Sequence, residues 1–184
     1  MVNISPIICV DLDGTLISSN TTKKTALFLL KKNPFLIFSF LSWILRGFVF
    51  FQSKLIQKMQ LDPGHFTYNQ ILLTFLYQQK EHGASIYLVT ASDEKIALKI
   101  SQHLHVFSGV IASQKHTLLT GFTKARLLEK NFGETPFDYI GNSILDIPSW
   151  LICRNRFFAG NNRFIYYILH HLMAVKKIEL DTRR

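Results

Sequence analysis

The sequence predicts an α/β fold: a Rossmann-like parallel sheet flanked by helices, with an all-helical insertion after the first strand. Short apolar runs rich in β-branched residues alternate with helical patterns along most of the 184 residues. Strands that alternate with helices form parallel sheets covered on both faces. Residues 18–66 interrupt this alternation, because they carry helical patterns only. We therefore expect a core of residues 1–17 and 67–184 and a helical insertion of residues 18–66.

Strands are predicted where an apolar run ends at a polar or small residue. The first run, Ile7 to Val10, ends at Asp11. Further strands are expected over residues 85–89, 106–111, 137–140 and 157–159. Ligands of parallel α/β sheets bind at the carboxyl ends of the strands. We therefore expect Asp11, Thr90 and Gly141 to lie together at one edge of the sheet.

Apolar residues at helical spacing predict the helices. In the core they indicate helices around residues 71–76, 96–104 and 125–132 and a closing helix over residues 164–172. Gly133 is expected to end the third of these. In the insertion the pattern predicts helices over residues 21–32, 35–46 and 48–60, which Asn33-Pro34 and Arg46-Gly47 separate.

Charge and hydrophobicity are both concentrated in the insertion. The chain is 18% charged and 13% aromatic, a composition that argues against a disordered protein. Its net charge is +9, yet from Gly14 to Leu61 it carries seven Lys or Arg and no Asp or Glu. The most apolar window, Pro34 to Phe51, lies in the same segment. Basic residues embedded in an apolar segment are not typical of a nucleic-acid surface, so no nucleic-acid partner is expected.

The cysteines and the N-terminus bear on the compartment. Cys9 and Cys153 cannot form a disulfide framework, and no basic residue precedes the first apolar stretch. We therefore expect a reduced, cytoplasmic setting and no secretory signal. The apolar window is at the lower limit of a membrane-spanning length and is broken by Arg46-Gly47, so no spanning helix is expected.

An acidic motif, Asp11-Leu12-Asp13-Gly14-Thr15, follows directly on the first strand. Asp11 and Asp13 can point to the same side of the chain, and two close carboxylates favour a hard cation such as Mg²⁺. Gly14 allows a sharp turn, and Thr15 can donate a hydrogen bond nearby. Taken alone, these five residues also fit a loop with two solvated acids.

Four motifs in order resemble the haloacid dehalogenase (HAD) superfamily of phosphohydrolases. The acidic motif is the first, a strand that ends at Thr90 is the second, and Lys124 at a helix start is the third. The fourth is a strand followed by Gly141-Asn142 and, further on, Asp146. The resemblance implies a HAD-type phosphatase, a hydrolase of phosphoric monoesters that acts through an aspartyl-phosphate intermediate.

The resemblance also implies roles for the catalytic residues. Asp11 would be the nucleophile, and Asp13 would protonate the leaving oxygen and then activate water. Thr90 would hold a phosphoryl oxygen, and Lys124 would neutralise its charge. Two alternatives remain open from the residues themselves, since Lys115 could replace Lys124 and Ser92 competes with Thr90.

Further residues complete the expected site. Contacts with the phosphorylated substrate are expected from Gly14, Thr15, Ala91 and Ser92, and Mg²⁺ ligands are expected to be Asp11, Asp13, Asn142 and Asp146. Asn142 departs from the family pattern, which mostly has a carboxylate there, and a neutral amide binds Mg²⁺ more weakly. Asp138, at the other end of its strand, is expected to be structural.

The insertion resembles the family's small helical cap, which closes over the site and selects the substrate. Its apolar and basic character leaves two interpretations: a cap that packs on the core, or a cap that rests on a membrane interface with lysines on anionic head groups. Three segments are similar to HAD domains fused to polyprenyl-type prenyltransferases: Leu30 to Pro34, Leu88 to Asp93 and Asp138 to Ser143. In that subgroup Gly-Asn-Ser is the usual fourth motif.

The predicted substrate is a phosphorylated small molecule or a lipid-linked phosphate. In the second case the protein would be cytoplasmic and peripheral at the inner membrane surface. One alternative is a soluble small-metabolite phosphatase of the phosphoserine phosphatase type, which predicts polar cap groups facing the site. Another is a membrane- or partner-binding module with a vestigial site.

Overall fold

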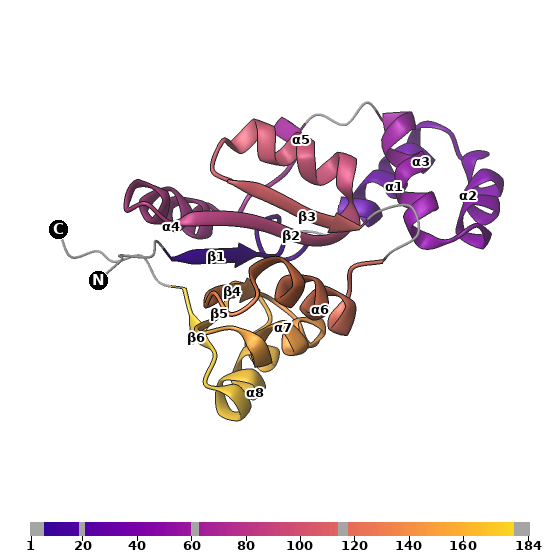
Figure 1. Cartoon of the computed structure of the whole chain (residues 1–184). Helices are drawn as coiled ribbons and strands as arrows, with labels where there is room; N and C mark the ends of the chain where they lie inside the picture. Colours follow the sequence, from indigo (N-terminus) through magenta and orange to yellow (C-terminus); the bar gives the residue numbers. More distant parts are fainter. Residues whose placement is uncertain (1–5, 19–20, 60–62, 114–117, 179–184) are drawn as a thin grey trace.

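Six parallel strands form one sheet at the centre of the computed structural model, in the order β3-β2-β1-β4-β5-β6 (Figure 1). The structure describes residues 6–18, 21–59, 63–113 and 118–178. The strands are β1 (Ile7–Val10), β2 (Ser85–Asp93), β3 (Gly109–Ser113), β4 (Phe137–Gly141), β5 (Arg156–Phe158) and β6 (Lys176–Lys177). Each neighbouring pair is parallel, which confirms the predicted α/β class.

Some strand limits differ from those predicted. The third strand starts at Gly109 instead of residue 106, because Val106 is buried ahead of the ladder and Ser108 makes the first main-chain bond to Ile86. The second continues past Thr90 to Asp93 with a shift of register between these two residues. The two-residue strand β6 was not predicted, since a Lys-Lys pair carries no apolar signal.

Helices cover both faces of the sheet (Figure 1). On one face lie α4 (Gln70–Glu81) and α5 (Glu94–Leu104), and on the other lie α6 (Gly121–Phe132), α7 (Ile147–Ile152) and α8 (Arg163–Met173). Gly133 ends α6 with a positive φ of 56°, as expected. The six-residue helix α7 was missed because it is too short for a periodic pattern to emerge.

The alternation of side chains along β1 divides the core in two. Ile8 and Val10 pack with the buried faces of α4 and α5, whereas Cys9 packs with residues from α6, α7 and α8. All three side chains are almost fully buried. Both faces of β1 are apolar because the strand lies at the centre of the sheet, with a layer of helices on each side.

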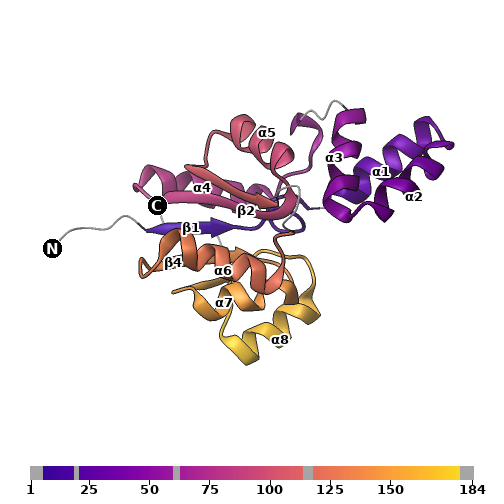
Figure 2. The same ribbon diagram turned by 45° about the vertical axis from the view of Figure 1, so that its right-hand side comes forward.

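The cap is a separate bundle of three helices beyond one end of the sheet (Figure 2). It comprises α1 (Thr21–Lys32), α2 (Leu36–Leu45) and α3 (Phe48–Met59), close to the predicted helices, and a single turn of 3₁₀ helix follows at Pro63–His65. Its own small core consists of Leu29, Leu36, Phe40, Phe51 and Leu55. No helix within the described residues is long and apolar enough to cross a membrane.

Two chain segments join the cap to the core side by side. The amide of Ser18 donates to the carbonyl of Thr67 at 3.1 Å, and that of Asn69 donates to the carbonyl of Leu16 at 2.8 Å. These bonds lie close to the predicted domain limits at residues 18 and 66, which stay a prediction.

Candidate active site

The predicted site residues meet at the carboxyl ends of β1, β2 and β4, the end of the sheet that faces the cap (Figure 1). Val10 lies between Leu88 and Ile140 in the sheet, so the residues that follow these three emerge side by side. A pocket of about 250 Å³ opens there. The predicted residues that line it are Asp11, Asp13, Thr90, Ala91, Ser92, Lys124, Asn142 and Asp146.

Lys124 is the buried cation of the pocket. It lies in the first turn of α6, which Thr120 and Thr123 cap reciprocally, and it is 4% exposed. Its Nζ lies 2.8 Å from Oδ1 of Asp11 and 3.3 Å from Oδ1 of Asp146. The alternative residue, Lys115, lies outside the residues that the structure describes. Of the two lysines, only Lys124 can therefore be placed in contact with the expected nucleophile.

Tyr139 completes this buried network and was not predicted. Its hydroxyl accepts a hydrogen bond from Lys124 Nζ at 3.0 Å and donates one to Asp146 Oδ1 at 2.8 Å. The side chain is fully buried in the middle of β4, where an apolar strand pattern gives no signal for a polar role. In this network a single lysine is shared by two carboxylates.

The network shifts the pKa values of its members. Burial raises the pKa of Asp11 to about 7, and the Lys124 ammonium opposes this shift without cancelling it. Burial alone would lower the pKa of Lys124, but the carboxylates of Asp11 and Asp146 outweigh it and the pKa is raised. Burial, followed by the charge of Asp146, raises the pKa of the Tyr139 hydroxyl. Lys124 is therefore charged and Tyr139 is protonated at neutral pH.

Thr15 and Gly14 of the acidic motif contact two residues that line the pocket, Asp11 and Asn142. The Thr15 hydroxyl donates to Asp11 Oδ2 at 3.3 Å and is itself 1% exposed. Gly14 has a positive φ of 81°, and a Cβ there would lie 2.0 Å from Nδ2 of Asn142. Neither residue is among those that line the pocket in the described part of the chain. Their predicted substrate contacts stay predictions, and the geometry favours a supporting role.

Asp13, Thr90 and Ser92 also line the pocket and are joined by hydrogen bonds. Ser92 Oγ donates to Asp13 Oδ2 at 2.5 Å, and the amide of Ser92 donates to Thr90 Oγ1 at 3.0 Å. A hydroxyl that accepts one hydrogen bond can still donate its own proton. Thr90 is thus suited to bind a phosphoryl oxygen, whereas Ser92 orients the expected acid and base.

Asp146 has its oxygens occupied by protein donors. Oδ2 accepts from the amides of Asn142 and Ser143 at 3.1 Å each and from Ser143 Oγ at 3.2 Å, while Oδ1 accepts from Lys124 and Tyr139. A Cβ on Gly141 would lie 2.7 Å from the carboxyl carbon of Asp146, so glycine permits this approach. The saturated carboxylate favours Asn142 over Asp146 as a direct metal ligand.

The remaining oxygen donors fit a hard cation. No group of three or more His, Cys, Asp or Glu side chains suited to a metal occurs in the described residues, so a metal site depends on other oxygens as well. The amide of Asn142 packs against Gly14, next to Asp13 and in the same pocket as Asp11. Carboxylate, amide and main-chain carbonyl oxygens are the ligands that Mg²⁺ prefers.

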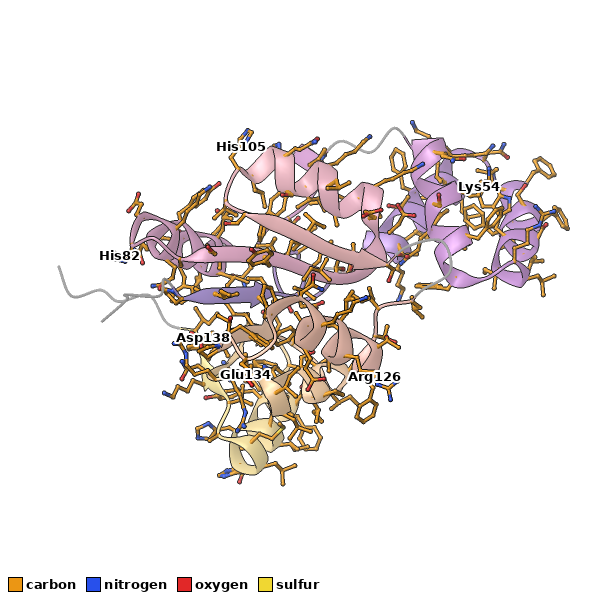
Figure 3. All side chains as sticks on the ribbon, in the orientation of Figure 1. Lys54, His82, His105, Arg126, Glu134 and Asp138 are labelled. Atoms are coloured by element: carbon orange, nitrogen blue, oxygen red, sulfur yellow. The ribbon has the colours of Figure 1, made fainter. Side chains whose placement is uncertain are left out.

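Asp138 lies away from the pocket, toward the opposite end of the sheet from the cap (Figure 3). Its carboxylate accepts from Arg154 Nε at 2.9 Å and Nη2 at 3.0 Å, and from Asn155 Nδ2 at 2.9 Å. These contacts tie β4 to the segment before β5, which agrees with the structural role expected for this acid.

Among the described residues of the cap, Phe48 and Gln52 of α3 line the pocket, and neither was predicted. Phe48 is 47% exposed and Gln52 is 3% exposed. Their place in the pocket depends on how the cap is set over the sheet, which no sequence motif encodes.

No protein-family model matches the chain. The uncharacterized protein y4nM of Sinorhizobium fredii (strain NBRC 101917 / NGR234) is 30% identical over 145 residues, which are 79% of this chain and 28% of that protein. The chain thus spans just over a quarter of the length of this curated relative.

Solved structures give the fold. A HAD family hydrolase, t0658 of Salmonella enterica serovar Typhi, superposes with a TM-score of 0.67 at 12% identity over 94% of this chain and 67% of that one. The chain has the HAD hydrolase fold. A phospho-aspartyl intermediate analogue of phosphoserine phosphatase superposes with a TM-score of 0.63 at 16% identity over 97% and 96%. A protein of unknown function from Bordetella pertussis Tohama I, with a TM-score of 0.68 at 12% identity, covers 95% of this chain and 99% of its own.

Proposed function

We propose that this chain hydrolyses phosphomonoesters through an aspartyl-phosphate formed on Asp11. The observation that carries the proposal is the buried Asp11–Lys124 pair, 2.8 Å apart at the end of β1, with Thr90 in the wall of the same pocket. The carboxylate can attack the phosphoryl group as a nucleophile. The fixed ammonium beside it can stabilise the negative charge of that group. The HAD fold, shared with the phospho-aspartyl analogue of phosphoserine phosphatase, supports the same chemistry.

The reaction would proceed in two displacements. In the first, a carboxylate oxygen of Asp11 forms a bond to phosphorus, the bond to the leaving oxygen breaks, and Asp13 gives that oxygen a proton. In the second, Asp13 takes a proton from water, the water oxygen bonds to phosphorus, and the bond from phosphorus to Asp11 breaks. Lys124 and Thr90 hold the phosphoryl oxygens throughout.

Asp11, Asp13 and Asn142 would hold Mg²⁺, with Asn142 as the neutral ligand. The ion supplies positive charge that offsets the repulsion between the Asp11 carboxylate and an incoming phosphate. Asp146 has a positioning role in this scheme, because its hydrogen bonds orient Lys124, Tyr139 and the backbone at Asn142.

The decisive test is hydrolysis of an aryl phosphate with and without Mg²⁺. We expect activity in the wild type, loss of activity on removal of Mg²⁺, and no activity in Asp11→Asn. Glu129→Gln, at an exposed position on α6, is the matched control and should keep full activity. Equal rates in the wild type and Asp11→Asn, or no hydrolysis in either, would exclude the enzyme and leave the binding module with a vestigial site.

A second part of the proposal concerns where the substrate comes from. Apolar side chains are strongly exposed on the cap, and Leu45 at 89%, Phe35 at 79% and Phe38 at 70% are the extreme cases. Lys31 and Lys32 are exposed at the end of α1, and Arg46 is exposed between α2 and α3. Lys54 lies on α3 of the same bundle (Figure 3). Apolar groups flanked by cations suit an anionic membrane interface. We infer that the cap brings the site to lipid-linked or membrane-proximal phosphates.

Vesicle co-sedimentation tests this part independently of catalysis. We expect binding to vesicles that contain phosphatidylglycerol and much weaker binding to neutral vesicles or at high salt. The double variant Phe35→Ser/Phe38→Ser and the charge variant Lys31→Gln/Lys32→Gln should each reduce binding. Lys130→Gln, an exposed lysine on α6, should not. Retention of binding in both double variants would show that these cap residues are not the membrane contact, and no binding by the wild type would favour the soluble small-metabolite phosphatase.

A further inference from the structure

One buried polar group in the pocket is left without a protein partner. Gln52 lines the pocket from the cap side and is 3% exposed. Its Nε2 donates to the hydroxyl of Thr22 at 2.7 Å, but its Oε1 has no hydrogen-bond partner among the residues that the structure describes. The remaining polar side chains of the wall, which belong to the core, mostly contact one another.

A buried amide oxygen without a partner destabilises the folded protein, and native proteins rarely tolerate one. Where such a group lines a binding pocket, a ligand can supply the missing partner. The two ends of a glutamine amide have nearly the same shape, so either end can face Thr22. In both orientations one end of the buried amide lacks a protein partner among the described residues.

We propose that Gln52 recognises a hydroxyl on the leaving group of the phosphomonoester, an inference that rests on the proposed function. A hydroxyl both donates and accepts, so it can pair with either end of the amide. Gln52 belongs to α3 and lines the pocket together with residues of the sheet edge. It is therefore placed to contact the part of the substrate that lies beyond the phosphoryl group.

The charges of the pocket favour a neutral leaving group. The charged residues that line its described part are Asp11, Asp13, Lys124 and Asp146, all from the core, and the cap adds only Phe48 and Gln52. A zwitterionic leaving group such as serine would need its own counter-charges on the cap side. A neutral polyol needs only a hydrogen bond and an apolar contact, which Gln52 and the half-exposed Phe48 provide.

Binding of two matched esters tests the inference. Glycerol 3-phosphate and n-propyl phosphate share a three-carbon chain and differ in their hydroxyls. Calorimetric titration of the full chain with Mg²⁺, in an Asp11→Asn background that prevents turnover, gives the two dissociation constants. The two dissociation constants are measured for three proteins: the Asp11→Asn background, the background with Gln52→Leu, and the background with Gln57→Leu. Gln57 is exposed on the same helix and serves as the control. Thermal unfolding of each protein shows that it is folded.

We expect glycerol 3-phosphate to bind roughly tenfold more tightly than n-propyl phosphate, since one buried polar group gains its partner. Gln52→Leu should abolish this difference, and Gln57→Leu should preserve it. Equal affinities in the background protein, or a difference that survives Gln52→Leu, would overturn the inference. Failure of both esters to bind would also overturn the inference. In that case the proposed function stands if the wild type still hydrolyses an aryl phosphate, and it fails as well if the wild type does not.

The same comparison on lipids identifies the source of the hydroxyl. Phosphatidylglycerol phosphate carries a hydroxyl next to its terminal phosphate, whereas phosphatidic acid has none on its leaving group. A preference for the first lipid in vesicles that disappears in Gln52→Leu supports the inference with a lipid head group as substrate. A preference confined to the soluble esters supports it with a free polyol phosphate, and no preference in either set contradicts it.

Discussion

At the edge of the sheet, Asp11, Lys124 and Asp146 are buried charges that contact one another, whereas the cap leaves Phe38 and Leu45 largely in solvent. At the sheet edge, the polar side chains contact one another, so their geometry is fixed before a substrate binds. The second region has few such contacts and a small apolar core of its own. This difference fits the proposed function, in which the sheet edge carries out the reaction and the cap selects the substrate.

The strongest test of this comparison removes the cation from the buried network. Lys124→Met removes the cation that Asp11 and Asp146 share and leaves two buried carboxylates close together, so we expect a loss of about 3–5 kcal/mol in the free energy of unfolding. Loss of the Lys124 ammonium should lower kcat/KM on an aryl phosphate by on the order of a hundred- to a thousandfold. Denaturant unfolding and steady-state kinetics measure the two effects. Lys130→Met on the same helix should change neither, and a folded, fully active Lys124→Met protein would refute the preorganised site.

Within the cap, a buried and an exposed leucine allow the effect of core packing to be separated from the effect of surface exposure. Leu55 is 1% exposed in the cap core and Leu45 is 89% exposed. Leu55→Ala should cost about 2–5 kcal/mol in the free energy of unfolding, because it opens a cavity. Leu45→Ala should stay within about 0.5 kcal/mol of the wild type and yet weaken vesicle binding. Similar stability losses in the two variants would mean that Leu45 is covered in the native protein.

The metal site offers a smaller change. Asn142→Asp adds a carboxylate beside Asp11 and Asp13, so the Mg²⁺ concentration for half-maximal activity should fall by roughly tenfold. Without Mg²⁺ the added negative charge should lower the melting temperature. Asn131→Asp, at an exposed position on α6, serves as the control. An unchanged Mg²⁺ requirement would argue that Asn142 is not a ligand.

The smallest expected effect concerns the hydroxyl of Tyr139. Tyr139→Phe removes one donor to Asp146 and one acceptor from Lys124 but leaves the ion pairs in place. We expect a loss of about 1–3 kcal/mol in the free energy of unfolding and a modest fall in kcat with KM unchanged. Tyr167→Phe on the exposed face of α8 should be neutral. A fall in kcat as large as that of Lys124→Met would give Tyr139 a direct part in the reaction.

Much of the fold could be predicted because local pattern and tertiary environment agree. Ile7 to Val10 are apolar on both faces of the strand, which suits the centre of a parallel sheet, and the cap helices follow breaks at Asn33-Pro34 and Arg46-Gly47. The misses fall where the local signal is weak. Helix α7 has six residues and β6 has two, so neither is long enough to show a period.

The sequence by itself determined the order of the motifs and therefore which side chains reach the edge of the sheet, because the carboxyl ends of parallel strands meet there. It also determined that the excess positive charge lies in an apolar insertion. Only the tertiary structure decided that Tyr139 joins Lys124 and Asp146, that Asp146 is saturated by hydrogen bonds, and that Gln52 enters the pocket. These contacts join residues from different elements, and their partners depend on how helices and strands pack rather than on any spacing along the chain.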